Sequence, residues 1–231
     1  MVVLTGAGIS AESGLATFRD AEGLWENHRI EDVATPEAFV RRPELVQRFY
    51  NARRHQLVHG DIQPNAAHRA LVRLEKEWEG EFLLVTQNID DLHERAGSQN
   101  LIHLHGELRK VRCLACGFLV PWDEEIVVGS RCPGCGESDS LRPHVVWFGE
   151  MPLELDRIGA ALSRCDLFLA IGTSGHVYPA AGFVESARYQ GGARCIEFNL
   201  SATEISDAFH EHHLGRSGDL LPGWVENFLR D

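Results

Sequence analysis

The stretch from Val85 to Gly106, VTQNIDDLHERAGSQNLIHLHG, places polar and titratable side chains directly after an apolar run. That run, Phe82–Val85, predicts a buried strand, and it ends in the polar sequence TQNID. Open α/β folds bind ligands beyond the carboxyl ends of their strands, so a ligand site is expected here. A second short run, Leu101–His105, then leads to Gly106. We expect one pocket, with a histidine as general base, lined by Gln87, Asn88, Asp90 and His105.

A glycine-rich turn follows the first apolar run of the chain. Val2-Val3-Leu4 leads into TGAGIS at residues 5–10, which predicts a strand, a tight turn and the start of a helix. Glycines let the backbone approach a pyrophosphate closely, and free N–H groups at a helix start favour its negative charge. The next glycine is Gly14, so the spacing is not the G-x-G-x-x-G of dehydrogenases. The turn favours a dinucleotide site, with a plain strand-to-helix turn as the alternative.

Strands alternate with helices, which predicts an α/β fold with a doubly wound parallel sheet. Helical patterns cover residues 30–79, 153–164, 180–190 and 220–229, with helix starts at Pro36 and Pro43. Apolar strands are expected at 2–4, 82–85, 167–171 and 194–198. They end in the polar or glycine-rich turns Thr5-Gly6, Gln87-Asn88, Gly172-Thr173-Ser174 and Asn199-Leu200. Together at one sheet edge, these turns predict a dinucleotide cleft, with glycines at the phosphates and hydroxyls and amides at the riboses.

The composition is that of an ordinary globular enzyme, with 231 residues, 44% hydrophobic and 24% charged. A net charge of -12 argues against general affinity for nucleic acid or anionic membranes, because both need clustered Lys and Arg. An acidic protein can still bind a basic peptide. No apolar run approaches the roughly 18 residues of a membrane-spanning helix. Met1 leads straight into the first strand without a signal peptide, so we expect a cytoplasmic protein with no membrane partner.

Four of the six cysteines form two C-x2-C pairs that are separated by 15 residues. This spacing is typical of a zinc ribbon with one Zn²⁺; a redox C-x-x-C and unrelated cysteines are the alternatives. Four thiolates leave no open coordination position, so the metal would be structural. The expected ligands are Cys113, Cys116, Cys132 and Cys135. Cys165 and Cys195 are expected to be small buried apolar residues.

Nucleic-acid binding is the alternative of a different class, because zinc ribbons also occur in nucleic-acid-binding proteins. Between residues 109 and 142, however, the chain carries five basic and five acidic side chains. This balance leaves no basic face, so nucleic acid is not an expected partner.

Together these motifs resemble the sirtuins, the NAD-dependent protein deacylases, and most closely the bacterial members of class III. The matching motifs are GAGIS at 6–10, TQNID at 86–90, HLHG at 103–106, the four cysteines and GTS at 172–174. The resemblance implies a larger Rossmann-like domain from residues 1–29, 81–108 and 143–231. It also implies a smaller domain made of a helical module at 30–80 and the zinc ribbon at 109–142. NAD and an acyl-lysine protein or peptide would meet between the two domains.

Two features depart from the family pattern. The chain starts almost at the first strand, and Ala16 stands where the family loop often carries proline.

The resemblance also implies a role for each matching residue. The phosphates would be held by Gly6, Ala7, Gly8 and Ser10, with Phe18 and Arg19 covering the cofactor. The nicotinamide half would lie against Gln87, Asn88, Ile89 and Asp90, and the adenosine half against Gly172, Thr173, Ser174, Asn199, Leu200, Ser201 and Ser217. The catalytic residues would be His105, Asn88 and Asp90.

In the implied reaction, the acyl oxygen of the lysine captures C1′ of the NAD ribose as nicotinamide leaves. His105 then removes a proton through the ribose hydroxyls, and water releases lysine and O-acyl-ADP-ribose. A histidine suits this proton transfer near neutral pH because its ordinary pKa is about 6.5. From the local pattern alone, His103 and His93 are nearly as plausible, and only the resemblance selects His105.

The spacing of Tyr50 and Arg53 places a phenol and a guanidinium on one face of a predicted helix, where they can bind a carboxylate. A tyrosine on the apolar stripe beside a solvated arginine is the alternative from pattern alone. Class III sirtuins carry Tyr-x-x-Arg here to read succinyl-, malonyl- and glutaryl-lysine, so the resemblance implies desuccinylation as well as deacetylation. The small Ala34 would leave room for the longer acyl chain. The substrate backbone would pair as an added strand with the loop containing Val146, Phe148 and Gly149.

Another NAD-consuming enzyme is the alternative function. A mono-ADP-ribosyltransferase cleaves the same glycosidic bond and would yield modified protein in place of O-acyl-ADP-ribose. A plain dehydrogenase agrees less well with the spacing of the glycines.

Overall fold

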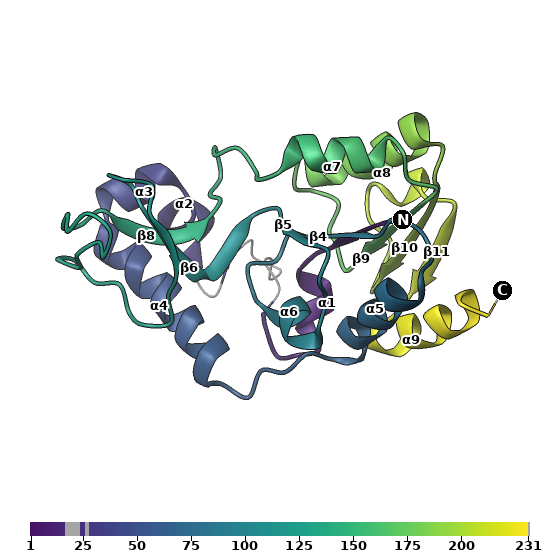
Figure 1. Cartoon of the computed structure of the whole chain (residues 1–231), viewed down its shortest axis with the longest axis horizontal. Helices are drawn as coiled ribbons and strands as arrows, with labels where there is room; N and C mark the ends of the chain where they lie inside the picture. Colours follow the sequence, from purple (N-terminus) through teal and green to yellow (C-terminus); the bar gives the residue numbers. More distant parts are fainter. Residues whose placement is uncertain (17–23, 26–27, 231) are drawn as a thin grey trace.

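The computed structural model describes residues 1–16, 24–25 and 28–230. Its larger part is a six-stranded sheet in the order β11-β10-β9-β1-β4-β5, and every neighbouring pair is parallel (Figure 1). The strands are β1 (Val2–Thr5), β4 (Leu83–Thr86), β5 (Leu101–His103), β9 (Leu167–Ile171), β10 (Arg194–Asn199) and β11 (Glu211–Leu214). The sheet grows from β1 to β4 on one side and to β9 on the other. Strand order therefore reverses at β1, which is where open sheets bind ligands.

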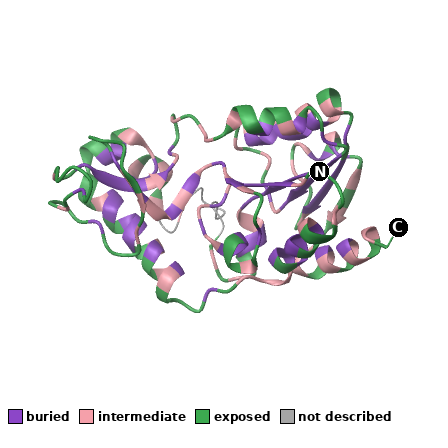
Figure 2. Ribbon diagram, in the orientation of Figure 1, coloured by how far each residue is buried: buried purple, intermediate pink, exposed green. Residues whose placement is uncertain are grey.

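Helices cover both faces of this sheet, so its strands are buried (Figure 2). Val2 and Leu4 pack with α7 and α8 on one face, and Val3 packs with α5 and α9 on the other. Such two-sided burial explains why these strands read as continuous apolar runs. The helices of this part are α1 (Ala7–Ala11), α5 (Ala66–Glu77), α6 (Leu92–Ala96), α7 (Leu155–Leu162), α8 (Phe183–Ser186) and α9 (Ser217–Phe228). The predicted doubly wound α/β fold is confirmed.

Several elements differ from the sequence-based prediction. The helix expected at 180–190 is divided into a 3-10 turn (Ala180–Gly182), α8 and a π-helical turn (Ala187–Gly191). A further 3-10 turn, Ser206–Ala208, precedes β11, and α9 starts at Ser217 rather than Leu220.

Strand β11 was not predicted, because its sequence, EHHL, carries a single apolar residue. It pairs at the sheet edge, where its histidines contact side chains of β10. The rings of His213 and Phe198 stack with centroids 4.6 Å apart. His212 Nδ1 lies 2.9 Å from Oε1 of the buried Glu197. Edge strands tolerate polar sequences of this kind.

The smaller part combines helices with a three-stranded antiparallel sheet. Its helices are α2 (Ile30–Val33), α3 (Pro36–Arg41) and α4 (Pro43–His59). Its sheet has the order β7-β6-β8, with β6 (Gly106–Cys113), β7 (Leu119–Pro121) and β8 (Leu141–Val145); β2 (Leu24–Trp25) pairs separately with β3 (His28–Arg29). The two predicted prolines stand at the helix starts, and Thr35 Oγ1 accepts a hydrogen bond from Ala38 N at 3.1 Å.

Strand β6 links the two parts, since it begins just after β5 and runs into the smaller part (Figure 1). Gly106 is required at this junction: its φ is +80°, and a Cβ there would lie 2.2 Å from the carbonyl oxygen of His144. The three-stranded sheet thus extends beyond the predicted zinc-ribbon range 109–142. The predicted domain boundaries stay a prediction.

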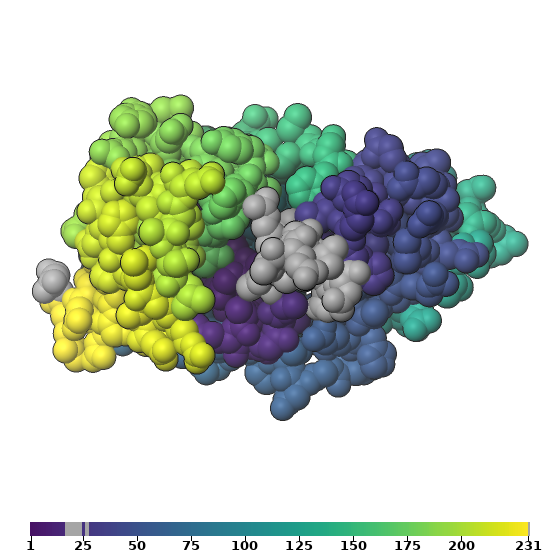
Figure 3. Space-filling model, turned by 180° about the vertical axis from the view of Figure 1, so that it is seen from behind, coloured from purple at the N-terminus to yellow at the C-terminus, as the bar shows by residue number. Residues whose placement is uncertain are grey.

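Seen from behind, the N-terminal residues (purple) lie between the C-terminal residues (yellow) and the helices of the smaller part (blue) (Figure 3). Within residues 1–16, 24–25 and 28–230, no helix is both long and apolar enough to cross a membrane.

Candidate active site

A cavity of about 600 Å³ is lined by the carboxyl ends of the parallel strands, by α4 and by the loop after β8. It brings together the predicted cofactor and catalytic residues Gly6, Ala7, Gly8, Ser10, Gln87, Asn88, Ile89, Asp90, His105, Gly172, Thr173, Ser174, Asn199, Leu200 and Ser201. It also brings in the predicted substrate residues Ala34, Tyr50, Arg53, Val146, Phe148 and Gly149.

One predicted cofactor residue of the described part, Ser217, does not line this cavity, and its hydroxyl donates to Glu12 Oε1 at 3.3 Å. Phe18 and Arg19 lie outside the described residues.

The glycine turns after β1 and β9 pack against each other. A Cβ on Gly6 would lie 2.7 Å from the carbonyl oxygen of Gly172, and a Cβ on Gly8 would lie 2.7 Å from the Cα of Gly172. Gly6 N donates to Ile171 O at 3.0 Å, and Gly8 N donates to Gly172 O at 2.9 Å. The expectation that these N–H groups are free for a phosphate is therefore wrong for Gly6 and Gly8. These glycines let the two loops approach, which shapes the sheet-side wall of the cavity.

A hydrogen-bonded network joins this turn to the loop after β4. Asn88 Nδ2 donates to Gly6 O at 3.1 Å and to Ser10 Oγ at 3.0 Å. Ser10 Oγ in turn donates to Asp90 Oδ2 at 3.0 Å, and Leu92 N donates to Asp90 Oδ1 at 3.1 Å. Burial raises the pKa of Asp90 to about 6, although these two hydrogen bonds oppose the rise. The network fixes Asn88 and Asp90 at the cavity and commits the Ser10 hydroxyl to Asp90.

The structure separates the three histidines that local pattern left open. His105 lines the cavity, whereas His103 and His93 do not. Because a carbonyl only accepts hydrogen bonds, the contact of 3.1 Å between His105 Nδ1 and Gln87 O places the ring proton on Nδ1. Burial lowers the pKa of His105, and the hydrogen bond to Gln87 only partly offsets this. His105 is thus held neutral, with the lone pair of Nε2 able to accept a proton.

His103 has a different environment. Its Nε2 lies 2.6 Å from Glu94 Oε1, and its Nδ1 lies 3.2 Å from Asn88 O. Burial alone would lower its pKa, but the hydrogen bond and charge of Glu94 outweigh that and raise it. His93 is buried beneath the sheet edge, with Nε2 3.0 Å from Thr5 Oγ1. Neither ring is placed to serve as a base in the cavity.

The opposite wall is built by α4 and the loop after β8. Tyr50 is fully buried, and its hydroxyl accepts a hydrogen bond of 2.9 Å from Trp147 Nε1. Burial raises the pKa of Tyr50 well above its ordinary range, so the phenol keeps its proton. The half-buried Arg53 donates from Nη1 to Phe49 O at 2.5 Å, and its guanidinium carbon lies 3.3 Å from the centroid of the Phe49 ring. Arg53 lines the cavity beside Tyr50, and its role in binding a carboxylate stays a prediction.

The loop after β8 offers fewer backbone donors than an added strand would use. The N–H groups of Val146 and Phe148 donate to His105 O at 2.9 Å and Ala34 O at 3.0 Å. The N–H of Trp147 donates to Glu150 Oε2 at 2.8 Å. Two carbonyl oxygens here are also used: Val145 O accepts from Arg142 Nη2 at 2.7 Å, and Trp147 O accepts from Glu150 N at 2.9 Å. The pairing of a substrate backbone with this loop stays a prediction.

Sequence reasoning did not assign several residues that line the cavity. They include Gln56, Trp147, Glu150, His176, Tyr178 and Thr203. Trp147 lies in the segment that was expected to pair with the peptide, but its contact with Tyr50 joins residues 97 positions apart. No local periodicity signals such a contact.

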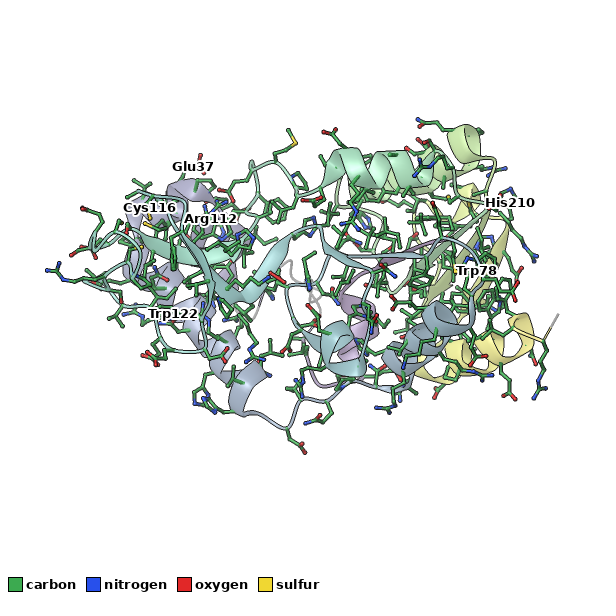
Figure 4. All side chains as sticks on the ribbon, viewed as in Figure 1. Glu37, Trp78, Arg112, Cys116, Trp122 and His210 are labelled. Atoms are coloured by element: carbon green, nitrogen blue, oxygen red, sulfur yellow. The ribbon has the colours of Figure 1, made fainter. Side chains whose placement is uncertain are left out.

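The cysteines of the two C-x2-C motifs lie together in the smaller part, where Figure 4 labels Cys116. The labelled Trp78 and His210 lie at the opposite end of the molecule. Cys113 Sγ and Cys135 Sγ are 3.8 Å apart, as are Cys116 Sγ and Cys132 Sγ, and all four sulfurs lie within 4.8 Å of one another. A tetrahedron with Zn–S bonds of about 2.3 Å has edges of about 3.8 Å. The four thiolates therefore fit one structural Zn²⁺. Cys165 and Cys195 are buried, as predicted.

Comparison with known proteins agrees with this geometry. The Sir2 family model matches residues 6–179. The NAD-dependent protein deacylase of Salmonella typhimurium is 58% identical over 230 residues, which cover 100% of this chain and 84% of that protein. A solved Sir2 homolog–NAD complex is 41% identical, with a TM-score of 0.89 over 99% of this chain and 88% of that chain. A Sir2 protein solved with a myristoylated histone peptide is 34% identical, with a TM-score of 0.76 over 99% of this chain and 90% of that chain.

Proposed function

The chain belongs to the Sir2 family and is an NAD-dependent protein-lysine deacylase, and we propose that it removes succinyl and other dicarboxylic acyl groups as well as acetyl. Malonyl and glutaryl groups belong to the same proposed class. Its partners are acyl-lysine proteins or peptides. A cytoplasmic location is also part of the proposal.

The presence of Tyr50 and Arg53 in the same cavity as His105 carries this proposal. Arg53 is a permanent cation, and Tyr50 is a buried phenol that keeps its proton. A carboxylate at the end of an acyl chain can accept charge-assisted hydrogen bonds from both groups. An acetyl group carries no carboxylate to accept these hydrogen bonds. The small Ala34 also lines this cavity, which leaves space for the longer chain.

The sheet-side wall supports a role in the chemistry that all acyl groups share. Bound NAD would supply the ribose carbon that accepts the acyl oxygen as nicotinamide leaves. Asn88, held by Gly6 and Ser10, and the buried Asp90 would orient the ribose and carboxamide. His105 would accept a proton at Nε2, because its Nδ1 proton is committed to Gln87. The neutral ring that burial enforces is the form this step needs.

The test is a selectivity measurement on Arg53→Met. A hydrogen bond to a charged group contributes about 1.5 to 3 kcal/mol, so kcat/KM for a succinyl-lysine peptide should fall roughly 10-fold to 100-fold. The value for the acetyl peptide should change by less than about threefold. Release of nicotinamide and O-acyl-ADP-ribose is measured for both peptides.

Arg48→Met is the matched control, because Arg48 is exposed on the same helix and does not line the cavity. It should leave both values near those of the unaltered protein. An equal loss on both peptides in Arg53→Met would mean that Arg53 is only structural.

A further inference from the structure

We propose that Trp147 is a positioning residue that sets acyl selectivity by orienting the Tyr50 hydroxyl. This inference rests on the proposed function, because it concerns how the pocket reads an acyl carboxylate. A tyrosine hydroxyl has one proton to donate and lone pairs to accept. The indole N–H of Trp147 donates to that oxygen at 2.9 Å, so the phenol proton must point elsewhere. Tyr50 lines the cavity, and an acyl carboxylate there is the acceptor for that proton.

Burial makes this hydrogen bond directional. Trp147 is 2% exposed, so water does not reach its indole N–H and does not replace it as a donor to the phenol oxygen. In such surroundings a polar group without a partner is costly. The oxygen of Tyr50 therefore keeps its bond to Trp147, and the raised pKa of Tyr50 keeps the proton on the phenol at neutral pH.

A clamp from the smaller sheet holds the Trp147 ring in this position. The guanidinium carbon of Arg142, at 3% exposure, lies 3.3 Å from the centroid of the Trp147 ring. Glu150 ties the two together: its Oε1 accepts from Arg142 Nη1 at 2.6 Å, and its Oε2 accepts from Trp147 N at 2.8 Å. Arg112, from β6, donates to Glu150 Oε1 at 2.9 Å and completes the clamp. Figure 4 labels Arg112 in the same part of the molecule as Cys116.

Trp147 controls the orientation of the Tyr50 hydroxyl and does not control the charge of the cavity. Arg142 and Glu150 form an ion pair, whereas Arg53 is a cation that lines the cavity. Trp147 adds no charge. Its effect on a carboxylate passes through the direction of one phenol proton, and an acetyl group makes no use of that proton. Removing the indole N–H should therefore change selectivity more than turnover.

The test compares Trp147→Phe, Tyr50→Phe and the double variant on succinyl- and acetyl-lysine peptides, with NAD and the zinc-loaded protein. Trp147→Phe should lower the succinyl-to-acetyl ratio of kcat/KM roughly threefold to tenfold, the effect of one hydrogen bond. In the Tyr50→Phe background the same change should have no further effect on the ratio, because no hydroxyl is left to orient.

Two variants keep the test independent of folding. Replacing the Trp147 indole with benzothiophene, through an unnatural amino acid, removes the N–H and preserves ring size; it should reproduce the lowered ratio. Phe39→Leu loosens the packing of a ring whose centroid lies 5.3 Å from that of Trp147, without removing its N–H. It should lower the melting temperature and leave the ratio unchanged.

An unchanged ratio in Trp147→Phe and in the benzothiophene variant overturns the inference, as does an equal drop in the Tyr50→Phe background. Measuring Arg53→Met in parallel distinguishes a failure of the proposed function from a failure of the positioning role alone. If Arg53→Met also leaves the ratio unchanged, the proposed function fails. If only the Trp147 variants leave it unchanged, the positioning role alone fails.

Discussion

The two walls of the cavity are built in different ways. The sheet-side wall consists of turns at the carboxyl ends of parallel strands, and hydrogen bonds between these turns hold its glycines and the Asn88–Ser10–Asp90 network. In the module-side wall, α4 contacts the loop after β8 through the buried side chains of Tyr50 and Trp147, and Arg142 packs against the Trp147 ring. In the proposed function, the first wall would act on NAD and the common acyl oxygen. The second wall would meet the end of the acyl chain. Selectivity and chemistry should therefore respond to different substitutions.

His105→Ala gives the largest expected effect on the sheet-side wall. Loss of a general base typically costs 10²-fold to 10⁴-fold, so the steady-state rate of O-acyl-ADP-ribose formation should fall at least about 100-fold with either acyl peptide. His103→Gln is the control, since His103 lies outside the cavity lining, and it should retain most activity. Retained turnover in His105→Ala, or a loss with only one acyl group, would break the proposed division between the walls.

The buried carboxylate gives the next effect, which depends on pH. Burial raises the pKa of Asp90 from 3.8 to about 6, so the folded state disfavours its ionised form. The protonated Asp90 carboxyl stabilises the folded state fully at pH values below its unfolded pKa, and this contribution is lost as the pH rises towards 6. This shift corresponds to about 3 kcal/mol. Asp90→Asn cannot ionise, so its stability relative to the unaltered protein should increase by about that amount between pH 4 and pH 7.

Urea unfolding of both proteins across this range measures the difference, and loss of zinc at low pH cancels because the two share the cysteine site. A difference that does not vary with pH would show that Asp90 ionises as it does in water.

Gly8→Ala gives the smallest effect and tests the contact between the glycine turns. Its Cβ would lie 2.7 Å from the Cα of Gly172, and overpacking of this kind costs about 1 to 3 kcal/mol. The melting temperature should fall, and activity should fall equally on both peptides. Gly223→Ala is the control, because Gly223 lies in α9 with open space around it and should be neutral or stabilising. A changed succinyl-to-acetyl ratio in Gly8→Ala would show that the walls are coupled.

Much of the sheet-side wall could be predicted from sequence. Apolar runs such as Leu167–Ile171 identify buried strands, and parallel strands bring their polar carboxyl ends to one edge. The zinc ligands were likewise readable, because two knuckles with short spacing define one tetrahedral site. Strand β11 was missed because it pairs at an edge, where an apolar sequence is not needed. The use of the Gly6 and Gly8 N–H groups was also missed, since their acceptors belong to the turn after β9.

By itself, the sequence determined the alternation of strands and helices, the turns at the strand ends and the cysteine cluster, because each depends on residues close together in the chain. Local sequence pattern left His105 and His103 open, and the tertiary structure distinguishes them independently of the family resemblance. Nδ1 of His105 contacts Gln87 O, whereas Nδ1 of His103 contacts Asn88 O and its Nε2 lies beside the Glu94 carboxylate. The tertiary structure alone also placed Trp147 against Tyr50, 97 residues away. Such contacts depend on where the packed elements come together, and no local period encodes that position.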